Sequence, residues 1–262
     1  MGIARGSGLR IYYELTGTGR PLVLLHGAMG SIEAWRLGGY VEALAQGNQL
    51  ILVDLRGHGL SEKPVAPDAY LAERHVEDVV AVLDDVGLES AVLLGWALGG
   101  DVALAAAASN PDRVDGVVAI GAFGSTVGFG DVKKPELKGV RALATRLAKE
   151  GMGSVVAPLE AAGRPEWARL VRRADAKAMA AATRSLTLVK RGDRRLADVR
   201  PPILAVWGER EAPVPPAPPF PDGTRTVTIP GEDAIGAFTR SDVVVPEIRA
   251  FLAKVPIRRL DV

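Results

Sequence analysis

Cysteine is absent from this chain of 262 residues, and histidine occurs only three times. The lack of cysteine excludes disulfide bonds, thiol nucleophiles and cysteine-ligated metals. The net charge is only +1 and no long basic run occurs, so neither nucleic acid nor an anionic membrane surface is expected as a partner. The amino-terminal region has no apolar leader-like segment, and no apolar run reaches membrane-spanning length. We therefore expect a cytoplasmic protein.

The residues that are present favour a folded α/β domain. Hydrophobic residues make up 48% of the chain and charged residues 24%, which is typical of a globular protein with a sizeable core. Short apolar runs alternate with patterns of helical spacing, and this order predicts a mainly parallel sheet with helices on both faces. The runs expected as strands are Leu9–Leu15, Pro21–Leu25, Gln49–Asp54, Ala91–Leu94, Val114–Ile120, Pro202–Trp207 and Thr224–Ile229.

One part of the chain, residues 121–198, departs from this alternation. It contains helical patterns without a strand among them, at Pro135–Glu150, Gly153–Ala162 and Pro165–Val189. An insertion of this kind between strands predicts a helical lid over the ligand-binding end of the sheet. The predicted core then comprises residues 1–120 and 199–262.

The stretch Val92–Gly100 combines a strand, a tight turn and the start of a helix. Its turn reads Gly-Trp-Ala-Leu-Gly from residue 95 to residue 99, and helix formers follow as far as Ala108. A strand, a glycine turn and a helix in this order are the context of the nucleophile elbow, which holds a serine hydroxyl at a strained turn. Here Ala97 occupies the serine position, so the motif lacks its nucleophile.

Four features of the chain occur together in a fixed order. They are His26-Gly27 with Gly30, the Asp-Leu-Arg-Gly-His-Gly-Leu-Ser stretch from 54 to 61, the elbow, and a helical insertion before the Gly231–Asp242 loop. Together they make the chain resemble the α/β-hydrolase superfamily over nearly its whole length. The resemblance implies a catalytic triad whose nucleophile, acid and base positions fall at Ala97, Glu211 and Ala234.

In triad enzymes of this family a serine attacks a carbonyl carbon, a histidine accepts the serine proton, and an acid orients the histidine. The methyl groups of Ala97 and Ala234 can neither attack a carbonyl nor accept a proton. Glu211 could serve as the acid, but it has no histidine to orient. The resemblance therefore implies a relative of hydrolases that cleave ester, carbon–carbon or amide bonds, and we predict that this chain is hydrolytically inactive.

The part of the site that depends on the backbone is retained. By resemblance, the amides of Ala28 and Leu98 converge on one point and form an oxyanion hole. These amides either bind a ligand oxygen or hold only water. Met29 and Trp96 flank the two positions, and they either line a pocket for an apolar or weakly polar organic ligand or pack in the core.

No other residues are expected to replace the missing catalytic groups. His26 is expected to have a structural role, His58 to shape the loop beside the site, and His75 to lie at the surface. No cluster has metal-ligand spacing, and no Gly-x-Gly-x-x-Gly follows a strand, so neither a metal nor a nucleotide cofactor is expected.

Three hypotheses follow for the function. The chain is a serine hydrolase in which alanine was introduced at two positions, or a natural enzyme without a triad that catalyses a cyclisation, elimination or isomerisation, or a binding protein that has kept the cavity for a ligand. Alanine at both positions with intact neighbouring motifs favours the first. The six prolines of Glu211–Gly223, where the acid loop should lead into a helix, favour natural divergence. The sequence does not separate the three, and it leaves the oligomeric state open.

Overall fold

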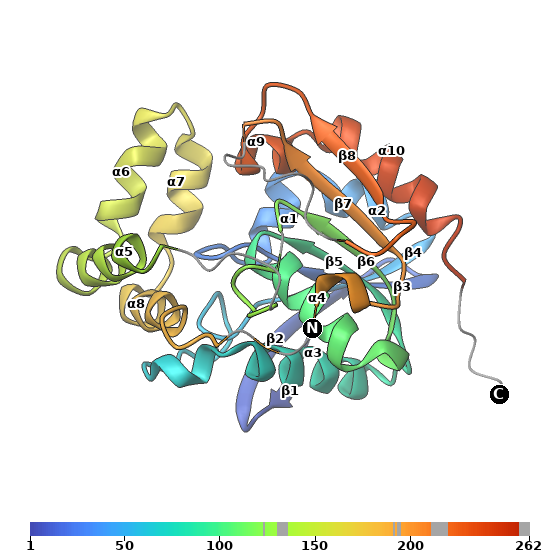
Figure 1. The fold of residues 1–262 in the computed structure, drawn as a ribbon, viewed down its shortest axis with the longest axis horizontal. Helices are drawn as coiled ribbons and strands as arrows, with labels where there is room; N and C mark the ends of the chain where they lie inside the picture. The colour runs from blue at the N-terminus through green and yellow to red at the C-terminus, as the bar shows by residue number, and fades with distance from the viewer. Residues whose placement is uncertain (123, 130–135, 191, 193–194, 211–219, 257–262) are drawn as a thin grey trace.

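An eight-stranded sheet runs through the part of the chain that the computed structural model describes (Figure 1). Its order is β1-β2-β4-β3-β5-β6-β7-β8, and β2 pairs antiparallel with β1 and β4 while the other neighbours are parallel. The strands are β1 (Gly2–Gly6), β2 (Leu9–Thr16), β3 (Arg20–Leu25), β4 (Asn48–Val53), β5 (Ala91–Trp96), β6 (Val114–Ile120), β7 (Ile203–Gly208) and β8 (Arg225–Ile229). The described residues are 1–122, 124–129, 136–190, 192, 195–210 and 220–256.

Side chains of the central strands alternate between two buried layers. On β3, Leu22 and Leu24 pack into one apolar cluster, and Val23 and Leu25 pack into the other. Because both faces of the sheet are covered, β5 is buried along its whole length and its sequence is a continuous apolar run rather than an alternating one. The mainly parallel sheet predicted from the sequence is therefore confirmed.

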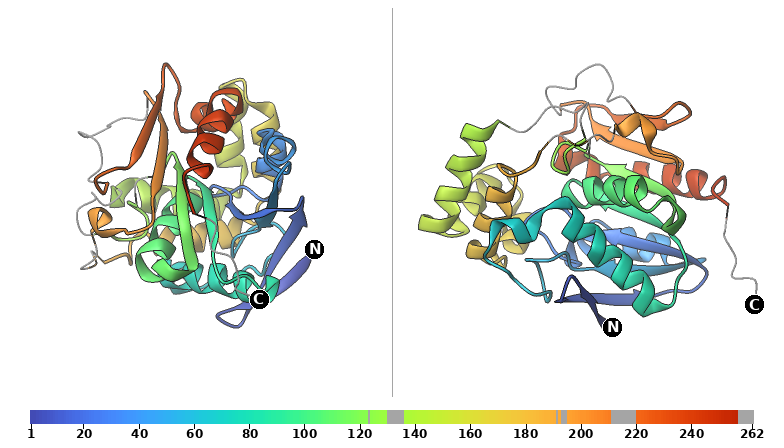
Figure 2. Two further views of the ribbon diagram at one scale, coloured as in Figure 1. Left: turned by 90° about the vertical axis from the view of Figure 1, so that its right-hand side faces the viewer. Right: turned by 60° about the horizontal axis from the view of Figure 1, so that its bottom comes forward.

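Helices cover both faces of the sheet, as the two views of Figure 2 show. α3 and α4 pack on the face of Val23 and Leu25, whereas α1, α2, α9 and α10 pack on the face of Leu22 and Leu24. These helices are α1 (Glu33–Leu37), α2 (Tyr40–Leu44), α3 (Ala72–Val86), α4 (Leu98–Ser109), α9 (Ala234–Thr239) and α10 (Ser241–Leu252). Short 3-10 helices are η1 (Pro67–Tyr70), η2 (Pro111–Arg113) and η3 (Leu196–Asp198). None of the helices in the described residues is both long and apolar enough to cross a membrane.

Four further helices form a layer beside the sheet (Figure 1), which we call the cap layer. They are α5 (Leu137–Glu150), α6 (Gly153–Ala161), α7 (Pro165–Arg172) and α8 (Ala176–Ser185). The cap layer has a small apolar cluster of its own, to which Leu147, Val156, Ala168 and Met179 belong. It falls within residues 121–198, and the action of this segment as a lid stays a prediction.

The prediction of one helix over Pro165–Val189 is wrong. α7 ends at Arg172 and α8 begins at Ala176. Between them, the Asp175 carboxylate accepts a hydrogen bond from the Ala178 amide at 2.9 Å and so caps the start of α8. The break allows α7 to pack against α6 while α8 packs against α5.

Candidate functional site

Ala97 forms the sharp turn between β5 and α4. Its backbone has φ +47° and ψ −113°, a region that residues with a Cβ rarely adopt and that costs about 1–3 kcal/mol. The turn is held by two backbone hydrogen bonds: the Ala97 amide donates to the Ile120 carbonyl at 2.8 Å, and the Ala97 carbonyl accepts from the Asp101 amide at 3.0 Å. The structure thus places a methyl group at the strained turn where the sequence motif would have a hydroxyl.

Glycines on either side of Ala97 let β5 and α4 approach each other closely. A Cβ on Gly99 would lie 2.0 Å from the Leu25 carbonyl oxygen, and one on Gly95 would lie 2.3 Å from the Gly99 oxygen. Contacts this short are forbidden, so only glycine fits at these two positions. The packing of strand against helix therefore fixes the turn, and Ala97 is carried into its strained conformation by its neighbours.

The turn faces a cavity of about 280 Å³. Ala28, Met29, Ala97 and Leu98 line it from the core side. α8 and the residue that follows it supply a further part of the wall, formed by Met179, Ala182, Thr183 and Leu186. The two predicted oxyanion-hole residues and the nucleophile position therefore line one cavity, which is bounded by the cap layer and is mainly apolar.

Two polar side chains in this wall hold loops in place. The Asp101 carboxylate accepts hydrogen bonds from the amides of Gly124 (2.6 Å) and Thr126 (3.0 Å) and from the Thr126 hydroxyl. The His58 Nε2 atom accepts from the Met29 amide at 3.0 Å, and its Nδ1–H donates to the Arg56 carbonyl at 2.9 Å. Neither side chain presents the arrangement of a catalytic base in this cavity.

His26 also forms hydrogen bonds that hold the loops beside the cavity in place. Its Nε2 accepts from the Leu55 amide at 3.1 Å, and its Nδ1 lies 2.8 Å from the Gly27 carbonyl oxygen. Burial lowers the pKa of His26 to about 4 and the pKa of His58 to about 3, so both rings are neutral near pH 7. Their hydrogen bonds tie the Gly27–Gly30 loop to the loop after β4, which is the structural role expected for both histidines.

The expectation that His75 lies at the surface is wrong. His75 is only 3% exposed, and the centroid of its ring lies 6.4 Å from the centroid of the Tyr70 ring. Burial, followed by the charge of the Arg56 guanidinium, holds the pKa of His75 well below its usual value. The signal for this burial was present in the sequence, because His75 shares one helical face with Ala72 and Val79.

Ala234 is the first residue of α9 rather than part of a loop. The helix is capped by Asp233, whose carboxylate accepts from the Gly236 amide at 2.7 Å. The Ala234 carbonyl accepts a hydrogen bond from the Trp96 indole at 3.3 Å, so the base position lies beside the residue that precedes Ala97. Ala234 is not one of the described residues that line the cavity beside Ala97.

Of the two alternatives that the sequence leaves for Trp96, a place in the pocket wall is wrong, because its side chain packs in the core. The residue is 7% exposed and its ring stacks on Phe238, with centroids 4.3 Å apart. A Cβ on Gly27 would lie 2.8 Å from the Trp96 ring, which places the indole directly under the Gly27–Gly30 loop. Met29, by contrast, lines the cavity. The predicted acid, Glu211, lies outside the described residues.

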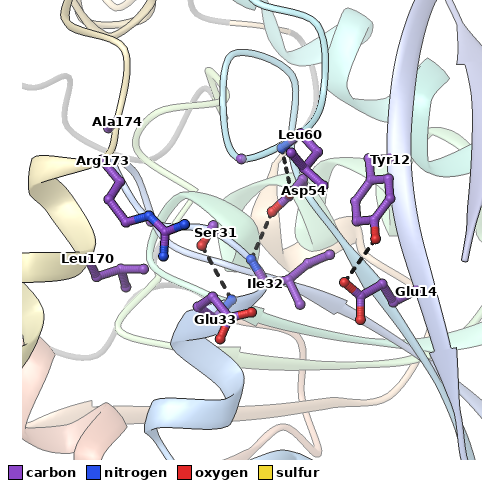
Figure 3. Close-up of a pocket in the computed structure, with 12 residues that line it drawn as sticks. Tyr12, Glu14, Ser31, Ile32, Glu33, Asp54, Leu60, Leu170, Arg173 and Ala174 are labelled. Carbon is purple, nitrogen blue, oxygen red and sulfur yellow. Dashed lines mark hydrogen bonds between the residues drawn. The ribbon is translucent and has the colours of Figure 1, made fainter.

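A second cavity, of about 270 Å³, was not predicted from the sequence (Figure 3). It lies between the Gly27–Gly30 loop, β2 and the end of α7, and Figure 3 shows Arg173 reaching from the cap layer toward Ser31. Its buried acid, Asp54, accepts hydrogen bonds at 2.8 Å from the amides of Ile32 and Leu60. Asp54 therefore connects the loop after β3 to the loop after β4. Among the described residues, no three His, Asp or Glu side chains gather as metal ligands would.

Comparisons with known proteins agree with this architecture. A family model described as the alpha/beta hydrolase fold matches residues 20–217. The 2-hydroxymuconate semialdehyde hydrolase of Pseudomonas sp. (strain CF600) is 36% identical over 119 residues, which are 45% of this chain and 42% of that protein. The chain spans about half the length of the curated relatives it matches.

Two solved structures superpose over almost the entire chain. The enol-lactonase from Burkholderia xenovorans LB400 has a TM-score of 0.81 at 21% identity, and the match covers 97% of this chain and 100% of that chain. The bottromycin epimerase BotH, in complex with bottromycin A2, has a TM-score of 0.80 at 24% identity, over 96% and 98% of the two chains. At these identities the likeness concerns the fold alone. Because the family model matches well over half of its residues, this chain belongs to the alpha/beta hydrolase fold family.

Proposed function

We propose that this chain binds a small, mainly apolar organic molecule in the cavity beside Ala97 and does not hydrolyse it. One observation carries the proposal: the residue at the strained turn, which lines the cavity, is alanine. A methyl group cannot form the covalent intermediate on which serine hydrolysis depends. Relatives of the chain include hydrolases, esterases and an epimerase, so loss of hydrolysis separates it from most of them.

The cavity offers the proposed ligand an apolar wall and backbone donors. Ala28, Met29, Leu98 and Leu186 contribute apolar surface. Leu98 is the first residue of α4, and amides in the first turn of a helix have no acceptor within that helix. We assign the Leu98 and Ala28 amides the role of binding a carbonyl or ether oxygen of the ligand.

The alternative of a non-hydrolytic enzyme requires a group that moves a proton. The described part of the cavity wall contains His58 and Asp101 as titratable side chains. The His58 Nε2 already accepts from the Met29 amide, and the Asp101 carboxylate accepts from Gly124 and Thr126. Both groups serve the loops that form the cavity, and for this reason we favour binding over proton-transfer catalysis.

The test uses p-nitrophenyl butyrate, because an inactive hydrolase should bind this ester without cleaving it. We expect the unmodified chain to release p-nitrophenol no faster than buffer and to show a rise in thermal midpoint that saturates with ester concentration. Leu186→Trp should fill the cavity and abolish the rise, whereas Leu137→Trp, at an exposed position on α5, should retain it. Ester cleavage by the unmodified chain that Leu186→Trp abolishes would overturn hydrolytic inactivity. An equal thermal response of both tryptophan variants would overturn binding in the cavity.

Restoring the triad positions tests the assignment of the site. Ala97→Ser and Ala234→His should each leave the chain inactive, because a serine needs a base and a histidine needs a nucleophile. The double variant should show measurable ester cleavage. Loss of the serine or the histidine costs on the order of a millionfold in turnover in an enzyme with the same triad on a different fold, so the single variants should be nearly silent. A single variant as active as the double would contradict the assigned roles.

A further inference from the structure

The cap layer carries a strong charge asymmetry. Residues 136–190 contain eleven lysines and arginines and five acidic residues, a net charge of +6, although the whole chain has a net charge of only +1. The rest of the chain is therefore acidic. A basic layer on an acidic core attracts anions to one side of the molecule.

Two arginines of this layer line a single groove of about 430 Å³ between α5, α8 and η1. Arg141 comes from α5 and Arg184 from α8, and both side chains are exposed. Two other arginines of the layer are paired: Arg164 contacts Asp233 at 2.9 Å, and Arg172 contacts Glu160 at 2.6 Å. Among the described residues, no acidic side chain lines the groove and none pairs with Arg141 or Arg184.

The remaining lining of the groove is apolar or already satisfied. Ala144, Leu188 and Pro67 supply apolar surface, and Leu188 is 46% exposed although it is a large hydrophobic residue. The hydroxyl groups of Thr145 and Thr187 donate to the backbone carbonyls of Arg141 and Arg184, each at 2.8 Å. The guanidinium groups are therefore the donors that the groove offers to a ligand.

We propose that this groove is a second binding site, which takes a small organic molecule with an oxyanion group next to an apolar part. The oxyanion, a phosphate or a carboxylate, bridges Arg141 and Arg184, because planar guanidinium groups bind such oxygens with paired, charge-assisted hydrogen bonds. The bound oxyanion also reduces the repulsion between the positive charges of Arg141 and Arg184, which lie on the packed helices α5 and α8. The apolar part covers Leu188. The site is separate from the cavity beside Ala97, since α8 lies between them and turns Thr183 to the cavity and Arg184 to the groove.

The probes are phenyl phosphate, benzoate and inorganic phosphate, titrated by calorimetry at constant ionic strength. We expect saturable binding of phenyl phosphate or benzoate, and weaker binding of inorganic phosphate, which lacks the apolar part. Comparison of the affinities for phenyl phosphate and for benzoate shows which oxyanion the site prefers. Arg141→Gln with Arg184→Gln should weaken binding by about tenfold or more, the loss expected for charge-assisted hydrogen bonds. Circular dichroism confirms that each variant is folded, and the two single variants are measured alongside.

The matched control removes the same charge elsewhere on the cap layer. Arg146→Gln with Arg169→Gln changes two exposed arginines outside the groove and should bind as the parent does. Equal weakening in both double variants would show a general effect of charge and overturn the site. Binding lost in Leu186→Trp but kept in the groove variant would place the ligand in the cavity beside Ala97 and also overturn it. If neither phenyl phosphate nor benzoate gives a saturable heat of binding, the proposed site is also overturned.

Discussion

Acidification should destabilise the folded chain, because its three histidines are all buried in the neutral form. His26, His58 and His75 are at most 3% exposed. Burial lowers the pKa of His26 to about 4 and that of His58 to about 3, and it holds the pKa of His75 well below the ordinary value of 6.5. Each folded pKa lies below the unfolded one, so the unfolded chain binds more protons below pH 6.5. The stability is fully present above this pH and is lost as the pH falls.

The expected loss is a substantial part of the stability of a domain. At pH 5 His26 and His58 each cost about 2 kcal/mol, because the pH lies about 1.5 units below the unfolded pKa and each unit is worth about 1.36 kcal/mol. These two together cost about 4 kcal/mol, and His75 adds to the loss in the same direction. Asp78 opposes them, since burial raises its pKa to about 6 against the lowering effect of Arg56, and the folded chain takes up a proton there first. Proton uptake by Asp78 offsets about 1–2 kcal/mol of the loss from His26 and His58, which leaves a net loss of at least about 2–3 kcal/mol against a typical free energy of unfolding of about 5–15 kcal/mol.

Urea unfolding at pH 7.5, 6 and 5, followed by circular dichroism, measures this loss. The free energy of unfolding should fall at each step below pH 6.5. His75→Leu removes one titrating group whose Nδ1 has no hydrogen-bond partner among the described residues. This variant should keep its stability at pH 7.5 and lose less stability than the parent between pH 6 and pH 5. Equal stability of the parent at pH 7.5 and pH 5, or an unchanged slope in His75→Leu, would refute the reasoning.

Three further predictions concern the turn and the cap of α9, and each is measured as a change in the free energy of unfolding. Ala97→Gly should stabilise the chain by about 1 kcal/mol, because glycine adopts φ +47° without strain; a destabilised variant would show that the turn is unstrained. Gly99→Ala should destabilise by more than about 3 kcal/mol, because its Cβ would lie 2.0 Å from the Leu25 oxygen; a loss under about 1 kcal/mol would mean that β5 and α4 separate easily. Asp233→Ala should cost about 1–2 kcal/mol by removing the helix cap and the ion pair with Arg164. Asp233→Asn, which can still cap α9, should cost under about 1 kcal/mol, and equal losses in the two variants would argue against the cap.

Seven of the eight strands in the described residues were predictable from the sequence because their signal is local, whereas β1 (Gly2–Gly6) was not predicted. The β6 strand was predicted with the bounds that the structure gives it, Val114–Ile120, since a buried parallel strand is one apolar run. Helix ends were less accurate where a single side chain decides them. Asp175 interrupts a long helical pattern, and Asp233 starts a helix within the Gly231–Asp242 segment, which the sequence motif predicts as a loop. In both cases an aspartate side chain competes for backbone amides, and helical periodicity does not register this competition.

The candidate site was predictable only where a motif defines it. The Gly95–Gly99 turn identified Ala97 as the residue at the bend, because glycine at those positions has a direct steric meaning. The wall supplied by α8 could not be predicted, since Thr183 meets Ala97 across a cavity formed by segments far apart in the chain. Trp96 was ambiguous for a related reason. An aromatic residue after a buried strand can face a pocket or the core, and its partner Phe238 lies on the last part of the fold.

The tight glycine contacts beside Ala97 separate the shape of this bend from its chemical identity. Gly95 and Gly99 have no freedom to change, because the Leu25 carbonyl and the helix backbone occupy the space that any side chain would need. Position 97 itself lines an open cavity and is not held by its side chain. Replacement there can therefore add or remove a nucleophilic side chain while the surrounding backbone stays the same. A lineage can abandon catalysis at this residue in one step and still keep a binding chamber that later substitutions can adapt to a different molecule.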